Sequence, residues 1–281
     1  MAPWAPRAGL ALKGLAWGLG LYAGLCLVVF MVQRRLMYFP DPCSEGEALQ
    51  RAGQLGLVPW RDADGTLLGW RRPGAHPGRP RILVFHGNAG DALGRIDYLP
   101  VLEAAGFEGV LAEYPGYGPR GGVRTEAALV AAGRQAFHRL RAESDAPVLL
   151  LGESLGSGVA AQVAGAEPRQ VAGLLLPVPF AHMGEVAARH YPYLPMSLLL
   201  LDRWDSLGAI AGYRGPVAIV VAARDEVVGA DQGHRLARAC PGDCRVWEVP
   251  GAAHNELPRL PGRPPWSEAL AFLKERVGMG Q

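Results

Sequence analysis

A serine flanked by glycines lies at the centre of the segment GESLG, which covers residues 152–156. The apolar run PVLLL precedes it and a stretch rich in small residues follows it, which is the strand–turn–helix context of a nucleophile elbow. Small neighbours are needed because the nucleophile at such a sharp turn has a strained backbone conformation. The pattern therefore predicts that Ser154 attacks a carbonyl carbon.

A serine hydroxyl is too weakly acidic to attack unaided, so it needs a histidine base and a carboxylate that orients the base. With an elbow of this type, the order along the chain is serine, acid, histidine. His254 follows the last predicted strand within GAAHN, and Asp225 follows the preceding strand within AARDE. Glu226 is the weaker alternative for the acid. We therefore predict Ser154, Asp225 and His254 as the catalytic residues.

The negative charge that develops on the attacked carbonyl oxygen requires backbone N–H donors. Leu155, the residue after the nucleophile, is expected to supply one of them. The loop HGNAG at residues 86–90 follows a predicted strand, and its glycines let the backbone turn towards the site. Asn88 in this loop is the expected second donor. This chemistry needs neither a metal ion nor an organic cofactor.

Short, nearly continuous apolar runs alternate with helical stretches rich in Ala and Leu between residues 81 and 249. Such runs are typical of parallel strands that are covered on both faces. Residues 55–70 precede them and predict an antiparallel hairpin that turns at Asp64-Gly65. Together these patterns indicate an α/β fold with a mostly parallel, doubly wound sheet and an antiparallel start. The predicted strands cover residues 81–85, 109–113, 148–151, 171–176, 217–221 and 245–249.

One insertion, at about residues 181–213, interrupts this rhythm between two strands. It should lie over the carboxyl edge of the sheet, where ligands of such folds bind. Its Tyr, Pro and Leu residues favour a cap that shapes an apolar pocket, and a packed crossover without ligand contact is the alternative. His182 and His190 are candidates for substrate contact. Asp202 and Asp205 precede the next strand and are less suitable than the aspartate after it as the acid.

The first 37 residues contain four basic side chains and no acidic one, whereas the other residues have a net charge of −2. Nineteen consecutive residues from Gly14 to Val32 have no charge, and as a helix they are long enough to cross a hydrocarbon core. A cleaved signal peptide would have a shorter apolar core and a small-residue cleavage site, and no convincing site follows Val32. A buried core helix would have a polar face, and this segment has none. We therefore predict a membrane anchor over residues 1–37, with a transmembrane helix at about 14–32, followed by one globular domain over 38–281.

The total charge of +2 excludes a strongly basic nucleic-acid-binding protein, and four cysteines are too few for a disulfide-built scaffold. Cys240 and Cys244, in CPGDC, can form a small disulfide or stay as two thiols. Basic residues on the two sides of the apolar segment nearly balance, with a slight preference for a cytoplasmic N-terminus. The many arginines and two lysines are typical of a GC-rich bacterial genome. Together these features predict a single-pass protein of a bacterial inner membrane with a periplasmic domain.

Seven motifs in order resemble the α/β-hydrolase superfamily, and within it the membrane-anchored group related to the yeast Bem46 protein and the mammalian α/β-hydrolase-domain proteins. The resemblance covers nearly the whole chain and implies a serine hydrolase that is tethered by its N-terminus, with Ser154, Asp225 and His254 as its triad. The family often has His-Gly before the acid and a proline after it, where this chain has alanines at 222 and 223 and Gly229. The matching motifs are QRRLMYFP (33–40), HGNAG (86–90), EYPGYG (113–118), GESLG (152–156), YPYLPMSLLLLDRWDS (191–206), RDEVV (224–228) and GAAHN (251–255).

The favoured function is hydrolysis of carboxylic esters or thioesters through an acyl-enzyme at Ser154. The anchor and the apolar insertion make lipids and other acyl-chain compounds the expected substrates. A serine peptidase or amidase with the same triad is the first alternative, and it is distinguished by its activity on aminoacyl amides. The second alternative is a membrane scaffold without catalysis, although such a protein would be free to lose members of the triad.

Overall fold

An eight-stranded sheet forms the centre of the computed structural model, which describes residues 5–74, 78–257 and 265–278. The order of the strands is β10-β9-β8-β7-β4-β6-β3-β2. β4 and β6 to β10 are parallel to one another, whereas β3 is antiparallel to both β2 and β6. The strands are β2 (Val58–Arg61), β3 (Leu67–Arg71), β4 (Arg81–Phe85), β6 (Glu108–Ala112), β7 (Val148–Gly152), β8 (Val171–Pro177), β9 (Val217–Arg224) and β10 (Cys244–Ala253).

The expected fold class is confirmed, because an antiparallel hairpin precedes a parallel α/β sheet. Side chains alternate between the two faces of each strand, so Leu83 and Phe85 of β4 enter one core and Ile82 and Val84 enter the other. All four of these residues are buried, which explains why the central strands are continuous apolar runs. β10 runs beyond the predicted end at Val249 and brings the chain directly to residue 254.

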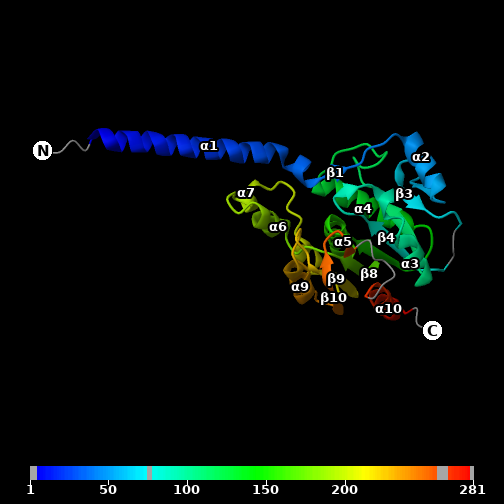
Figure 1. Cartoon of the computed structure of the whole chain (residues 1–281). Coiled ribbons are helices and arrows are strands. Elements are labelled where there is room, and N and C mark those ends of the chain that lie inside the picture. Colours follow the sequence, from blue (N-terminus) through cyan, green and yellow to red (C-terminus); the bar gives the residue numbers. More distant parts are fainter. Residues whose placement is uncertain (1–4, 75–77, 258–264, 279–281) are drawn as a thin grey trace.

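Helices cover both faces of this sheet (Figure 1). α4 (Glu126–Arg141), α5 (Leu155–Ala166), α8 (Ser206–Ile210) and α9 (Ala230–Ala239) contribute to one core. α2 (Glu45–Gln54), α3 (Tyr98–Ala104) and α10 (Trp266–Arg276) contribute to the other. These last three helices were not predicted. For α2 a signal is present in the sequence, since Ser44 and Glu47 form a capping box that satisfies free N–H groups at its start.

A long helix, α1 (Ala5–Met37), projects from this body (Figure 1). It is the one helix in the described part of the chain that is long and apolar enough to cross a membrane, over Leu10–Met37. A short parallel pair, β1 (Phe39–Pro40) with β5 (Ala89–Gly90), joins the end of α1 to the body. The chain leaving α1 therefore runs beside the loop that follows β4.

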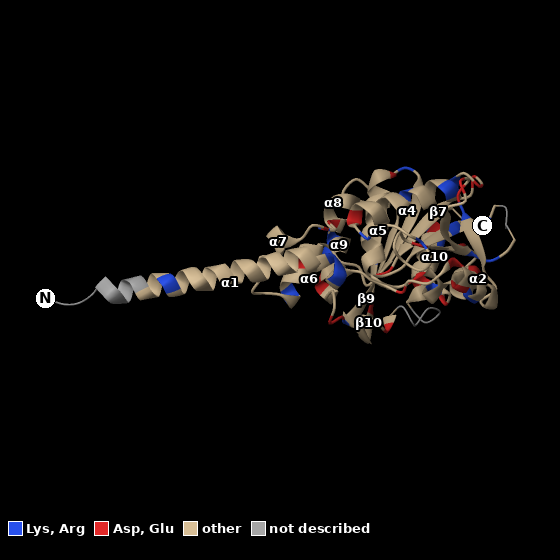
Figure 2. Cartoon of the chain, turned by 90° about the horizontal axis from the view of Figure 1, so that it is seen from above, with Lys and Arg blue, Asp and Glu red and all other residues tan. Residues whose placement is uncertain are grey.

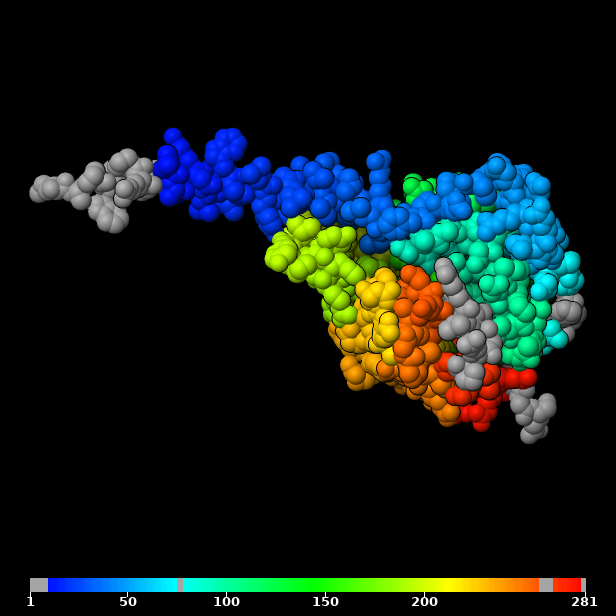
Figure 3. Space-filling model, viewed as in Figure 1, coloured from blue at the N-terminus to red at the C-terminus, as the bar shows by residue number. Residues whose placement is uncertain are grey.

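The predicted insertion contains two kinds of structure. α6 (Met183–His190) and α7 (Met196–Leu199) lie beneath α1, and we call residues 183–201 the cap (Figure 3). α8 instead packs so closely on α5 that a Cβ on Gly165 would lie 2.1 Å from the carbonyl oxygen of Ala209. Only the first two thirds of the insertion therefore stand over the sheet edge, and the remainder belongs to the core.

Candidate active site

Ser154 lies at the sharp turn between β7 and α5. Its backbone has φ of 50° and ψ of −115°, a conformation that a residue with a side chain rarely adopts. The flanking glycines have no room for a side chain. A Cβ on Gly152 would lie 2.4 Å from the carbonyl oxygen of Gly156, and a Cβ on Gly156 would lie 2.2 Å from that of Phe85. This turn therefore has the shape that the sequence motif predicts.

The structure brings the three predicted catalytic side chains together. His254 Nε2 lies 3.0 Å from Ser154 Oγ, and His254 Nδ1 lies 2.7 Å from Asp225 Oδ2. The three residues follow β7, β9 and β10, so the carboxyl ends of parallel strands place them at one edge of the sheet. With its proton on Nδ1, the imidazole donates to Asp225 and can accept the serine proton at Nε2.

The loop after β9 holds Asp225 in place, although the sequence around this loop departs from the family pattern at positions 222, 223 and 229. The second carboxylate oxygen, Oδ1, accepts hydrogen bonds from the N–H groups of Val227, Val228 and Gly229 at 3.0, 2.7 and 3.2 Å. Glu226, the alternative acid, instead accepts the backbone N–H of His254 at 3.3 Å. The Asp225 side chain, of which 3% is exposed, is therefore the carboxylate that faces the imidazole.

Opposing effects act on the pKa of Asp225. Burial raises it, but the hydrogen bond and the charge of His254, together with the N–H groups of Val228 and Gly229, have the larger combined effect. The pKa of this carboxyl group is consequently lower than its ordinary value. The folded protein thus favours the ionised form, which is the form that can orient the imidazole.

The lowered pKa predicts a pH-dependent contribution of Asp225 to stability. The contribution is complete above the unfolded-state pKa of about 3.9 and is lost as the pH falls through the lower folded-state pKa. The difference in free energy of unfolding between wild type and Asp225→Asn should therefore be smaller at pH 3 than at pH 5. Urea unfolding in detergent at both pH values measures it, and a difference that grows towards pH 3 would contradict the prediction.

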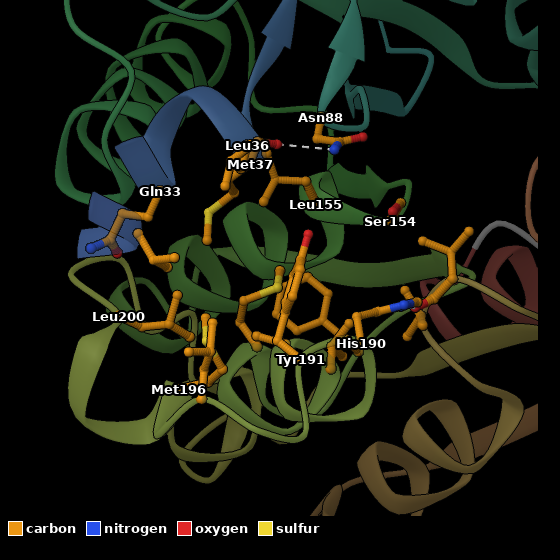
Figure 4. Close-up of a pocket in the computed structure, with 18 of the residues that line it drawn as sticks. Gln33, Leu36, Met37, Asn88, Ser154, Leu155, His190, Tyr191, Met196 and Leu200 are labelled. Atoms are coloured by element: carbon orange, nitrogen blue, oxygen red, sulfur yellow. Dashed lines mark hydrogen bonds between the residues drawn. The ribbon is translucent and has the colours of Figure 1, made fainter. Parts of the chain in front are cut away.

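The two expected oxyanion donors line the same cavity as Ser154. Within the described residues, neither the N–H of Asn88 nor that of Leu155 donates to a protein acceptor, so both are available to a substrate oxygen. The Asn88 side chain has a separate role, because its amide donates to the carbonyl oxygen of Met37 at 3.0 Å (Figure 4). It thus ties the loop after β4 to the last residue of α1.

Behind this loop lies a charged group, centred on the buried Glu153 carboxylate, that the sequence did not predict. The Glu153 carboxylate accepts two hydrogen bonds from the Arg95 guanidinium, at 2.7 and 2.8 Å, and a third from the Tyr98 hydroxyl at 3.1 Å. A Cβ on Gly87 would lie 3.2 Å from Glu153 Oε1. Glu153 therefore supports both the turn that contains Ser154 and the loop that contains Asn88. The sequence feature that could have indicated this charged group is the acidic residue directly before Ser154 in GESLG.

A cavity of about 300 Å³ extends from Ser154 between α1 and the cap. Most of its lining is apolar, and in Figure 4 the labelled side chains of α1 and of the cap lie on opposite sides of it. His190 lines the cavity, with its Nε2 2.7 Å from the carbonyl oxygen of Val227. His182 instead precedes α6 and forms an isolated β-bridge with Asp205. The cavity is suited to an apolar group bonded to a carbonyl carbon.

The remaining candidates have structural roles. Asp202 pairs with Arg34 at the end of α1, and Asp205 caps α8 by accepting the N–H of Gly208 at 2.8 Å. Neither is the carboxylate bonded to His254. Cys240 and Cys244 are both free thiols. Among the described residues, no group of three or more His, Cys, Asp or Glu side chains is arranged to hold a metal ion.

Comparison with known proteins gives several relatives and a shared fold, although no family model matches. The chain is 36% identical to the uncharacterized protein Rv2307c of Mycobacterium tuberculosis, over 92% of this chain and 93% of that protein. It is 32% identical to the lysophosphatidylserine lipase ABHD12 of Xenopus tropicalis, over 49% of this chain and 39% of the lipase. The solved esterase PF2001 of Pyrococcus furiosus aligns with a TM-score of 0.65 over 86% of this chain and 98% of its own, at 16% identity.

Proposed function

The chain belongs to the α/β-hydrolase superfamily, and from this we propose that it is a serine hydrolase that cleaves carboxylic esters or thioesters. Esterases and lipases among its relatives and structural neighbours support ester hydrolysis in general. One observation carries the serine mechanism. It is the continuous series of contacts from Ser154 Oγ through the His254 imidazole to the Asp225 carboxylate, at 3.0 and 2.7 Å.

In the first half of the reaction, Ser154 Oγ attacks the carbonyl carbon and transfers its proton to His254 Nε2. The N–H groups of Asn88 and Leu155 stabilise the negative charge on the carbonyl oxygen. The tetrahedral intermediate collapses, its bond to the leaving oxygen or sulfur breaks, and that atom takes the proton from His254. An alcohol or thiol leaves, and the acyl group stays on Ser154.

In the second half, a water molecule gives a proton to His254 Nε2 and attacks the acyl carbon. The bond to Ser154 Oγ breaks, the serine recovers the proton from His254, and the carboxylic acid is released. Asp225 remains ionised throughout, holding the imidazole in orientation and stabilising its protonated form. Its lowered pKa favours this ionised state.

We further propose that α1 anchors the enzyme in a bacterial inner membrane as a single transmembrane helix. Its length and composition suit such a span, and its large apolar side chains are exposed in the structure. The slight excess of positive charge before the span favours a cytoplasmic N-terminus and a periplasmic domain. An enzyme held there would encounter lipids and other acyl-chain compounds.

A fluorophosphonate probe tests the nucleophile directly, because it reacts with an activated serine without requiring knowledge of the substrate. Purified full-length wild type should be labelled, whereas Ser154→Ala should take up no label. Ser267→Ala, which changes an exposed serine on α10, should be labelled like wild type. Failure of the folded wild type to react would leave the scaffold as the better interpretation.

Substrate preference separates the esterase from the peptidase alternative. Wild type should hydrolyse short p-nitrophenyl esters faster than the matching aminoacyl amides. An amide preference would assign the same triad to a peptidase or amidase.

A further inference from the structure

α1 forms one wall of the cavity that contains Ser154. Val29, Gln33 and Leu36 line it from the helix, and Leu155 and Met196 are among the residues that line it from the body and the cap (Figure 4). Val29 also belongs to the apolar segment predicted to cross the membrane. The cavity therefore reaches from the proposed nucleophile to a surface that belongs to the transmembrane helix.

The cap runs along this helix rather than away from it. The Tyr22 hydroxyl donates to the carbonyl oxygen of Tyr193 at 2.8 Å. Gln33, which is 5% exposed, donates to the carbonyl oxygen of Leu199 at 3.0 Å and accepts the N–H of Leu201 at 2.8 Å. Tyr22 and Gln33 are separated by roughly 16 Å along the helix axis at 1.5 Å per residue. The cap thus lies beside the membrane-crossing residues for about half the thickness of a hydrocarbon core.

An ion pair between the partly exposed Arg34 and the buried Asp202 fixes the helix in this position. Arg34 donates to both carboxylate oxygens of Asp202, at 2.9 and 3.1 Å, and the Tyr38 hydroxyl donates to Asp202 Oδ2 at 3.0 Å. Asp202 is 4% exposed, and a buried carboxylate that loses its partners is costly. The end of α1 is therefore attached to the end of the cap by specific bonds, as well as by apolar contact.

Residues 191–201, which we call the cap tip, have the composition of a membrane-inserting segment. The sequence YPYLPMSLLLL contains no charge, whereas Arg189 precedes it and Asp202 and Arg203 follow it. Tyr193 is 88% exposed and Leu198 is 79% exposed. In Figure 2 the ribbons of α7 and of the neighbouring part of α1 are both tan, because neither contains Lys, Arg, Asp or Glu. Large exposed apolar side chains beside a membrane-spanning helix indicate a lipid contact.

From these observations we infer that the cap tip inserts into the same membrane leaflet as the C-terminal half of α1, and that the cavity opens there. This inference rests on the proposed hydrolase function for its substrate, which is the acyl chain of a membrane-resident ester or thioester. The acyl chain of the substrate moves from the leaflet into the space between α1 and the cap, and the carbonyl group of the substrate reaches Ser154 without crossing water. At ~30 Å³ for a group the size of water or methylene, the cavity holds roughly ten carbons, and the rest of a longer chain stays in the leaflet.

A charge on the cap tip tests the route by separating membrane-borne from water-borne substrates. Leu198 does not line the cavity. For full-length protein in phosphatidylcholine nanodiscs, Leu198→Asp should lower kcat/KM at least tenfold for a long-chain ester dissolved in the bilayer. Its kcat/KM for p-nitrophenyl acetate in water should stay within twofold of wild type. Val123→Asp, which changes a residue of the body that is 67% exposed, should affect neither substrate.

Equal losses of Leu198→Asp on the two esters, or no loss on either, would overturn the route through the leaflet. A second measurement does not depend on turnover. In Ser154→Ala, the photoreactive p-benzoylphenylalanine placed at position 198 should crosslink to phosphatidylcholine on irradiation, and the same group at position 123 should not. Absence of the lipid adduct at 198 would refute insertion of the cap tip. If the lipid adduct forms at position 198 but wild type hydrolyses neither ester, the cap tip inserts into the membrane and the hydrolase proposal is wrong.

Discussion

Replacing His254 with alanine is expected to lower kcat/KM for a short p-nitrophenyl ester by about 10⁴- to 10⁶-fold. His254 Nε2 is 3.0 Å from Ser154 Oγ, and within this site it is the group placed to take the serine proton and to return it to the leaving group. In the proposed mechanism, the hydroxyl without this base attacks at its unassisted rate, and the remaining catalysis comes from the two proposed oxyanion donors. Steady-state kinetics on full-length protein in detergent measures the loss.

His234→Ala is the matched control, since His234 lies on α9 and contacts Glu248 at 2.8 Å, away from the cavity. It should retain at least half of the wild-type kcat/KM. Fluorophosphonate labelling of His254→Ala should slow in parallel with hydrolysis, because both reactions need the activated serine. A variant of His254 that keeps more than a tenth of the wild-type rate would show that another base acts on Ser154.

Replacing Gly156 with alanine is expected to destabilise the protein by about 3 kcal/mol. The new methyl group would lie 2.2 Å from the carbonyl oxygen of Phe85 and 2.7 Å from that of His86. Both obstacles are backbone atoms of β4 and of the loop after it, so α5 would have to move away from the sheet. Because that loop contains Asn88, hydrolysis should fall together with stability. Urea unfolding and ester kinetics on the same preparation measure the two effects.

Gly46→Ala provides the comparison. Gly46 lies in α2, and a Cβ there would meet no heavy atom within 4 Å. Since alanine is preferred to glycine within a helix, this variant should be stabilised by up to about 1 kcal/mol. Equal stabilities of the two variants would mean that α5 can shift from β4 at little cost, contrary to the close packing at the elbow.

Much of the fold was predictable because its signals are local. The central strands of the sheet are runs of buried apolar residues, and β4 begins and ends where the sequence predicts. The helices α2, α3 and α10 were missed, although Ser44 and Glu47 contain the signal for the start of α2. Tertiary packing also shortened the expected cap, since α8 belongs to the core.

The candidate catalytic residues were predictable for a related reason. A parallel sheet places the carboxyl ends of its strands at one edge. Because Ser154, Asp225 and His254 each follow a predicted strand, the sequence was enough to predict that they lie together. The support from Glu153 and Arg95 was not foreseen. Those two residues are 58 positions apart, and no local pattern indicates that they pair.

The sequence alone determined the candidates for the proposed chemistry: a serine at a strand-to-helix turn, a histidine and an aspartate as its proposed base and acid, and an apolar segment long enough for a membrane. The tertiary structure decided where that segment lies relative to the chemistry. Arg34 meets Asp202 across 168 positions, and α1 thereby becomes a wall of the cavity at Ser154. Contacts of this kind depend on how surfaces that are distant in the sequence fit together in three dimensions. The hydrophobic periodicity and motif spacing of the sequence do not predict them.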